Sequence, residues 1–469
     1  MRTFRSPDHT SRRLRAVAAL AVFALAAGVL GGCAQDEEPA PADSSASGGS
    51  SAGTAAGSSG GSDGGSDGGS DEDAVTVSVG VFGVFGYRQA GLYDEYTKLH
   101  PHVRIKETSI ERNEQYYSQL LTHLAANSGL SDIQAVEVGN INEVTTTQAG
   151  KFVDLGKAAG VRKADYLSWK WDQATDEDGR TIGLGTDIGP MGICYRKDLF
   201  GRAGLPTDRT AVGRLWAGDW QKYLDTGRRY TAKAPAGTSY MDGAAGVYNG
   251  VISSSRIRNY DENGELIFKT SPSVKAAWNL AMQAAEGGMT ARFKQFTKEW
   301  DQGYANARFA TVICPSWMLG YIKEKSGTKG ADQWDVAPAP KPANWGGSFL
   351  TVPERARHKD EAVKLAAWLT APAQQAKLFA RQASFPSSRA AIALPEVSGA
   401  KHPYFGDAPI GRIFSDAARG MPTLVLGPKD QPIGQQVSDV GILQVEQQGK
   451  SPEEGWKATL KAVDNALDQ

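Results

Sequence analysis

The segment from residue 74 to residue 138 alternates between stretches with the periodicity of strands and stretches with the periodicity of helices. Between the strands, apolar residues recur at helical spacing, as at Leu92, Tyr96 and Leu99, and Pro101 and Gly129 end the two helical stretches. Strands separated by helices predict an α/β fold with a mainly parallel sheet, in which ligands bind beyond the carboxyl ends of the strands. The β-branched, alternating runs that predict strands are "AVTVSVGVFG" (74–83), "HVRIKE" (102–107) and "DIQAVEV" (132–138).

Length and charge narrow the function classes. The roughly 400 residues from 74 onward contain all eleven tryptophans and are enough for two domains, each with its own core. The formal net charge of the chain is -1, and no basic cluster follows the first fifteen residues, so we expect no nucleic-acid partner. The six histidines form no H-E-x-x-H or comparable spacing, so we expect no metal. Gly80, Gly83 and Gly86 recur every third residue and do not form G-x-G-x-x-G, so we expect no dinucleotide, and we expect no other cofactor.

The N-terminus has the order of an export signal. Five arginines within fifteen residues precede the uncharged apolar run 16–32, whose length of about seventeen residues suits a signal peptide better than a membrane span. The run closes on "LGGC", which resembles a bacterial lipobox, so residues 1–32 are the expected signal peptide and Cys33 the lipid-modified first residue. An ordinary secreted protein with a coincidental cysteine is the alternative. Residues 34–73 are mainly Ser, Gly, Ala, Asp and Glu with a repeated "GGSD", which predicts a flexible tether.

Several motifs beyond residue 138 occur in the order and spacing of a known family. They are "GKFVDL", "DGRTIGLGTDIGPMGICYRKDLFGRAGLP", "GYANARFATVICPSW" and "WGGSFLTVP". With them, residues 75–469 resemble the extracellular sugar-binding proteins of ABC importers, the family of the maltose-binding protein. This resemblance implies a two-lobed periplasmic-binding-protein-like fold of type II with the ligand in a cleft between the lobes. The run "GVFGVFGYRQAGLYDEY" is further similar to actinobacterial members that bind cello-oligosaccharides or related β-glucosides.

The same resemblance implies how the chain is divided. Crossings between the lobes are expected near residues 185–190, 344–350 and 384–388, and the glycines of "DIGP" and "WGGS" suit hinges because glycine absorbs large changes of φ and ψ. The implied segments are 74–187 plus about 346–386 for lobe 1, and 188–345 plus about 387–469 for lobe 2 with C-terminal helices.

A sugar site needs flat aromatic faces beneath the rings. Trp317 follows the strand-like "FATVI" and Trp345 lies at the second crossing, so both are candidate stacking platforms. The glycine-rich loop after the first strand would expose Phe85 and Tyr87 at the cleft. The alternative for the tryptophans is packing between the lobes, and for the loop it is a tight turn with its aromatic residues in the core.

A sugar site also needs acceptors and donors for hydroxyl groups. Glu137 and Asn140 follow the third strand, and Asp187 lies in the first crossing, so these three are the candidate rim residues. The alternative is that they cap helices or brace turns.

With Cys33 assigned to the lipid, Cys194 and Cys314 remain. Both fall on strand-like segments that the family places in the second lobe, in an oxidising compartment, so a disulfide between them is expected. Two buried free thiols are the alternative.

The resemblance therefore predicts a monomeric binding protein, held by lipid on the extracellular face of the membrane, that delivers an oligosaccharide to ABC permease subunits. An enzyme is not expected. A glycoside-processing enzyme, whose two carboxylates would stand about 5 to 10 Å apart, is the competing class. A binding protein for another solute, such as a polyol, is a further alternative.

Overall fold

The structure is a computed structural model that describes residues 74–468. The expected signal peptide, the expected lipid site at Cys33 and the expected tether lie outside the described residues. Within the described residues, no helix is both long enough and apolar enough to cross a membrane.

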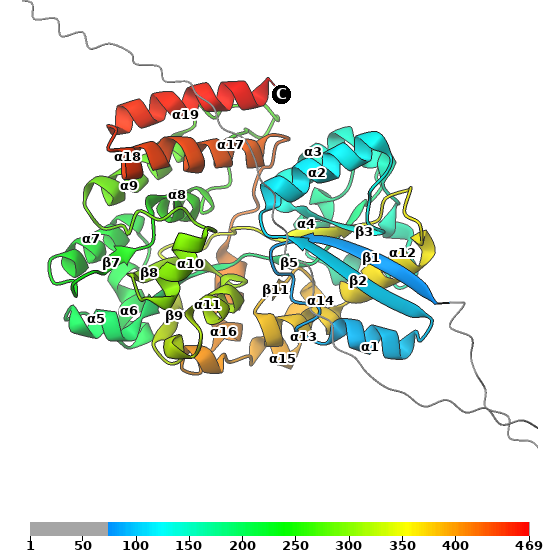
Figure 1. Ribbon diagram of the computed structural model, residues 1–469, viewed down its shortest axis with the longest axis horizontal. Coiled ribbons are helices and arrows are strands. Elements are labelled where there is room, and N and C mark those ends of the chain that lie inside the picture. The colour runs from blue at the N-terminus through cyan, green and yellow to red at the C-terminus, as the bar shows by residue number, and fades with distance from the viewer. Residues whose placement is uncertain (1–73, 469) are drawn as a thin grey trace, which may run out of the picture. The chain divides into compact units, whose positions relative to one another are not determined.

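A five-stranded sheet organises the first lobe, with strand order β2-β1-β3-β10-β4 (Figure 1). The three strands predicted from the N-terminal region are confirmed as β1, β2 and β3, and they pair in parallel. β10 runs antiparallel to both of its neighbours, so the sheet is mixed, although the other four strands run in one direction as the expectation of a mainly parallel sheet requires. The strand bounds are Val75–Phe82 (β1), Val103–Ile110 (β2), Ile133–Glu137 (β3), Gly183–Gly185 (β4) and Ser348–Thr351 (β10).

A second, four-stranded sheet with order β7-β8-β6-β9 organises the second lobe. β7 and β8 are parallel, whereas β6 is antiparallel to both β8 and β9, so this sheet is mixed as well. Its strands are almost entirely buried, which agrees with their continuous apolar sequences. The bounds are Met191–Arg196 (β6), Ser239–Met241 (β7), Phe309–Pro315 (β8) and Trp334–Pro338 (β9).

Helices cover both sheets, and their sequences explain where they begin. In α9, for example, Ser271 accepts a hydrogen bond from the N–H of Val274, Pro272 occupies the first turn, and Trp278 lies on the buried face. The helices around the first sheet are α1 (Leu92–Leu99), α2 (Asn113–Ala126), α3 (Val138–Thr147), α4 (Ser168–Gln173) and α12 (Lys359–Leu369). Those between β6 and β9 are α5 (Lys197–Arg202), α6 (Arg209–Trp216), α7 (Trp220–Thr231), α8 (Ala244–Ile252), α9 (Pro272–Glu286), α10 (Lys298–Ala305) and α11 (Met318–Ser326).

The described chain after β10 is mostly helical. α17, the π-helical turn that follows it and α18 form one continuous run, which packs with α19 against the core of the second lobe. The bounds are α13 (Pro372–Gln382), α14 (Arg389–Ile392), α15 (Pro395–Ser398), α16 (Ile410–Gly420), α17 (Asp430–Gln436), the π-helical turn (Val437–Ile442), α18 (Leu443–Gln448) and α19 (Pro452–Leu467).

The chain passes between the sheets in neighbouring segments. It runs from β4 through β5 (Asp187–Ile188) to β6, and β5 pairs antiparallel with β11 (Phe385–Pro386). The return from β9 to β10 passes through Gly346 and Gly347, whose φ values are +89° and +108°. A Cβ at Gly347 would lie 2.8 Å from the carbonyl oxygen of Asp187, so this crossing requires glycine.

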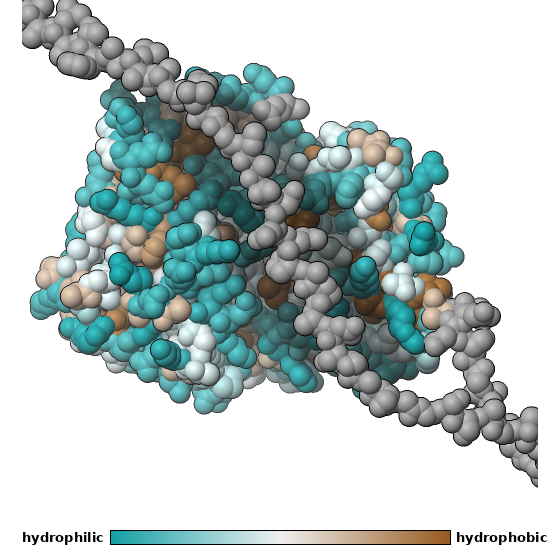
Figure 2. Space-filling model, viewed as in Figure 1, coloured by the Kyte–Doolittle hydropathy of each residue, from teal (hydrophilic) through white to brown (hydrophobic). Residues whose placement is uncertain are grey.

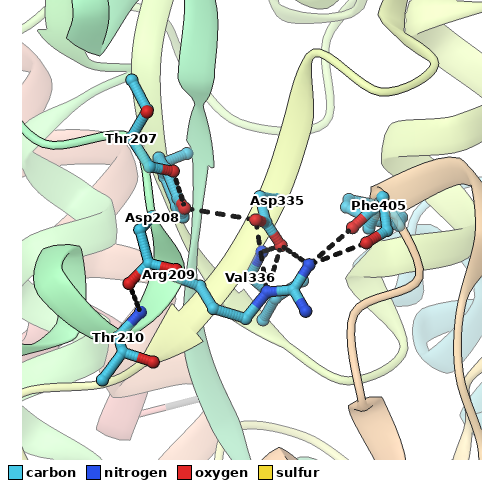
Figure 3. A network of polar contacts seen from close by, with 9 residues as sticks. Thr207, Asp208, Arg209, Thr210, Asp335, Val336 and Phe405 are labelled. Atoms are coloured by element: carbon cyan, nitrogen blue, oxygen red, sulfur yellow. Dashed lines mark hydrogen bonds and ion pairs between the residues drawn. The ribbon is translucent and has the colours of Figure 1, made fainter.

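A disulfide bond and an ion pair each link separate segments of the second lobe. The disulfide expected from the sequence is present: Cys194 in β6 is bonded to Cys314 in the adjacent β8, across a sequence separation of 120. Arg209, at the start of α6, donates through Nε to Asp335 of β9 at 3.0 Å and through a terminal nitrogen to the carbonyl of Gly406 at 2.8 Å (Figure 3). The guanidinium therefore joins a helix, a strand and a distant loop of the same lobe.

Candidate functional site

A cavity of about 810 Å³ lies where the crossings meet the carboxyl ends of β1, β2 and β3. This is the edge of the sheet at which the sequence predicted a ligand. We call this space the main cavity. The residues that line it come from both lobes and from the crossings. They include Phe82, Val84, Phe85, Tyr87, Arg112, Asn113, Glu137, Asp187, Phe296, Trp317, Tyr321, Trp345, Gly346, Arg381, Gln382, Ser384 and Gln431.

The two predicted tryptophans meet in the wall of the main cavity. Trp317 stands directly before α11, and its indole Nε1 donates to the carbonyl oxygen of Trp345 at 3.0 Å. The two rings meet edge to face with centroids 6.0 Å apart, and Trp317 also stacks on Phe296 at 6.3 Å. The structure thus brings the two expected platforms together, and it ties one of them to the second crossing.

Phe85 and Tyr87 also line the main cavity, although both pack against the core of the first lobe. Tyr87 is only 1% exposed, and its hydroxyl has no hydrogen-bond partner among the described residues. Burial, and then the nearby carboxylate of Asp187, raise the pKa of Tyr87 well above its ordinary value. Next to them, the side chain of Val84 is 57% exposed at the cavity. Large exposed apolar side chains are rare among the described residues, and the face drawn in Figure 2 is mostly hydrophilic.

The two predicted carboxylates, Glu137 and Asp187, face the main cavity and brace the backbone at the same time. Glu137 caps α3 by accepting a hydrogen bond from the N–H of Gly139. Asp187 accepts from the hydroxyl of Thr186 at 2.7 Å and from the N–H of Ser348 at 2.9 Å. Both carboxylates therefore accept hydrogen bonds from the backbone, as the alternative in the sequence analysis proposed. These hydrogen bonds hold both carboxylates in place at the wall of the main cavity.

Asn140 differs from the sequence expectation, because it does not line the main cavity. It is 1% exposed, and its Oδ1 accepts a hydrogen bond from Asn113 Nδ2 at 2.9 Å. The reason is its place in the first turn of α3, on the side that faces α2. Asn113 reaches the cavity instead.

Lys170 is the charged residue that the sequence did not single out. It lies on α4, is 1% exposed, and its ammonium has no hydrogen-bond partner within the described part of the chain. Its Nζ stands 3.7 Å from the centre of the Phe349 ring and interacts electrostatically with Asp187 and Glu137. Burial lowers the pKa of Lys170 to about 8, although the two carboxylates raise it. Burial likewise raises the pKa of Glu137 to about 7.

A smaller cavity of about 110 Å³ adjoins the main cavity, and we call it the polar annex. Glu137, Trp345, Gly346 and Gln431 belong to the walls of both cavities. Four further residues of its wall are used in the argument below. Arg258 and Asn259 follow α8, and Asp430 and Gly434 belong to α17.

Two ion pairs join the first lobe to the C-terminal helices beside these cavities. Arg112 lies 3.5 Å from Asp439, and Lys429 lies 3.2 Å from Glu143. The lobes therefore contact each other on the side of the polar annex. Among residues 74–468, no group of three or more histidine, cysteine or acidic side chains could hold a metal ion.

A two-lobed α/β chain with a cavity at its crossings has the architecture of periplasmic-binding proteins. Comparison with solved structures supports this class. The chain aligns with a family 1 extracellular solute-binding protein at 39% identity and a TM-score of 0.71, over 84% of this chain and 99% of the other. It also aligns, over 84% of its length, with a binding protein from B. animalis subsp. lactis Bl-04 in complex with β-1,6-galactobiose (18% identity, 98% of that chain, TM-score 0.71). The sugar-binding protein MalE from Xanthomonas citri aligns over the same share (19% identity, 98% of that chain, TM-score 0.62).

Residues 91–404 match the family described as bacterial extracellular solute-binding protein. A comparison with curated proteins returns no match. The family match spans most of the chain, and the chain belongs to this family. Its members bind solutes and are not enzymes, so this chain is an extracellular solute-binding protein.

Proposed function

We propose that the chain captures an extracellular oligosaccharide for an ABC importer. The observation that carries this proposal is the wall of the main cavity, where the tryptophan pair Trp317 and Trp345 stands with the carboxylates of Glu137 and Asp187. Aromatic faces suit the C–H faces of sugar rings, and carboxylates accept hydrogen bonds from hydroxyl groups. A volume of about 810 Å³ lies within the range of small-molecule sites and has room for several rings.

The mechanism we propose is capture by closure. Because the wall includes residues of both lobes and of the crossings, a ligand in the main cavity contacts both lobes at once. Such a ligand favours the closed arrangement by its differential contacts, and no covalent chemistry is needed. The closed form would then dock on permease subunits in the membrane.

Two finer points belong to the same proposal. The ligand is a cello-oligosaccharide or a related β-glucoside, a choice that rests on the sequence of the loop carrying Phe85 and Tyr87. The protein acts as a monomer at the extracellular face of the membrane, anchored through a lipid on Cys33 after removal of residues 1–32. A polyol is the competing solute.

Calorimetric titration of the mature protein tests the proposal. The panel is cellobiose, cellotriose, maltotriose, β-1,6-galactobiose and the polyol glucitol. We expect saturable binding of at least one oligosaccharide, with the sugar recovered unchanged afterwards by chromatography. Binding of glucitol alone, or of none of the five, would contradict the proposal.

Replacing Trp317 with alanine is expected to weaken binding of the best oligosaccharide at least tenfold, or about 1.4 kcal/mol, because a stacking face is lost. Calorimetry measures the change. Trp317→Phe keeps an aromatic face but loses the hydrogen bond to Trp345, so it separates stacking from the tie to the crossing. Trp456→Phe, at a partly buried side chain that packs against the core of the second lobe, is the control and should bind as wild type does. Unchanged affinity in Trp317→Ala would mean that the platform lies elsewhere.

A further inference from the structure

Two side chains that line the polar annex each carry a polar atom without a hydrogen-bond partner among the described residues. Arg258 Nε and Asn259 Oδ1 are buried and have no hydrogen-bond partner among the described residues. Both side chains are held in place by other atoms: Asn259 donates through Nδ2 to Asp430 at 2.7 Å, and an Arg258 terminal nitrogen lies 3.5 Å from Asp430. Asn259 is 6% exposed. Buried polar atoms normally have partners, so this fixed pair indicates a group that enters the annex.

The charges around the annex select an uncharged group. Arg258 is its cation, but Asp430 is already paired with it, and Glu137 adds a second carboxylate in the wall. An anionic ligand would therefore meet two carboxylates against one guanidinium. A hydroxyl group, by contrast, both donates and accepts, and so it suits a wall that offers the guanidinium of Arg258 and the side-chain amide of Asn259 without adding charge.

The size of the annex limits what can enter. A cavity that holds a single water needs only about 10 to 15 Å³, so a volume of about 110 Å³ admits a larger polar group but not several sugar rings. The walls shared with the main cavity, Glu137, Trp345, Gly346 and Gln431, connect this space to the site of the proposed oligosaccharide.

We propose that the polar annex is a specificity subsite for one uncharged, hydroxylated end ring of the ligand, read by Arg258 and Asn259. The subsite rests on the proposed function, since the remainder of the same ligand occupies the main cavity. It makes the chain discriminate by ligand length as well as by ring chemistry.

Gly434 provides a test that removes no charge. It lies in the annex wall, and outside its chain neighbours and the backbone of its own helix no described heavy atom comes within 4 Å of the position that its Cβ would take. Gly434→Leu therefore fills the annex, whereas Gly434→Ala is the matched control with a single added carbon. Arg258→Met removes the donor and keeps the apolar stem. Arg256→Met is its control, because Arg256 is 50% exposed, pairs with Glu262 and lines neither cavity.

Calorimetry with glucose, cellobiose, cellotriose, cellotetraose, maltotriose and β-1,6-galactobiose provides the readout, and circular dichroism checks the fold of each variant. For the sugar that binds wild type best, we expect at least tenfold weaker binding by Gly434→Leu and by Arg258→Met, and changes below threefold for both controls. We also expect Gly434→Leu to bind the sugar that is one ring shorter as well as wild type does, because the ring and its subsite are lost together.

The outcomes separate the two proposals. If a sugar binds wild type and both Gly434→Leu and Arg258→Met bind it equally well, the subsite is wrong and the proposed function stands. If both variants weaken all sugars to the same degree regardless of length, the subsite is also wrong. If no sugar binds wild type, the proposed function fails and the subsite fails with it.

Discussion

Replacing Lys170 with methionine is expected to lower the free energy of unfolding by about 3 to 5 kcal/mol near pH 7.5, the usual cost of breaking a buried charge cluster by removing one partner. Lys170 is 1% exposed, and its ammonium interacts electrostatically with the carboxylates of Glu137 and Asp187. Without it, the two carboxylates at the cavity wall lose the cation that lies behind them. The remaining cation near Glu137 is Arg258, which is paired with Asp430.

The effect has a defined pH window. The pKa of Glu137 is raised to about 7 in the folded chain, so its contribution to stability is complete below its ordinary value of 4.5 and is lost as the pH rises through 7. The pKa of Lys170 is lowered to about 8, so its contribution is complete above 10.5 and is lost as the pH falls through 8. The two charges coexist between these folded values, and the difference between wild type and variant should be largest there. Below about pH 4.5 the carboxyl of Glu137 is neutral, and the difference between wild type and variant should be smaller than at pH 7.5.

Urea unfolding of both proteins at pH 4.5, 6 and 7.5 measures the window. Lys163→Met is the matched control, since its side chain is 59% exposed and pairs with Asp172 on the surface. This control should change stability by less than about 1 kcal/mol at each pH. A pH-independent loss in Lys170→Met would show that the lysine acts by packing alone.

Removing the disulfide is the second large expected effect. Replacing Cys194 and Cys314 together with alanine should lower the free energy of unfolding by about 4 to 5 kcal/mol in the chain-entropy model, because the closed loop spans 120 residues. The folded state keeps the ladder between β6 and β8, so the loss acts on the unfolded chain. Affinity for the best oligosaccharide should therefore stay within threefold of wild type.

Two measurements check the disulfide. Urea unfolding compares the oxidised wild type with the double variant. Mass spectrometry after alkylation without reductant, on unfolded wild type, should find neither thiol modified. Two alkylated cysteines would exclude the bond, and equal stability of the two proteins would exclude its contribution.

Much of the fold could be predicted because its signals are local. The periodicity of residues 74–138 predicts β1, α1, β2, α2 and β3 in the right order. The direction of β10 could not be read in this way, because periodicity identifies a strand but not the side from which the chain enters the sheet. Its antiparallel pairing follows from the return of the chain through Gly346 and Gly347.

The residues of the candidate site also divide into those with a local sequence signal and those without one. Trp317, Trp345 and Asp187 stand next to strand ends or glycines, so their place at the cavity follows from sequence position. Lys170 had a weaker signal: it occupies an apolar position at helical spacing between Leu167 and Trp171, where a charge needs a buried counter-charge.

Arg258 and Asn259 had no such signal. They follow α8 in an irregular segment and meet α17 across a separation of about 170 residues, which only the folded chain reveals.

The edge-to-face contact of Trp317 with Trp345 has an optical consequence. Two indoles at 6.0 Å couple electronically, and both belong to the wall that a ligand would touch. A sugar that displaces water from their faces should move their emission to shorter wavelength and alter the near-ultraviolet circular dichroism. The protein therefore carries its own unlabelled reporter of occupancy, and Trp345→Phe would show how much of that signal comes from the pair.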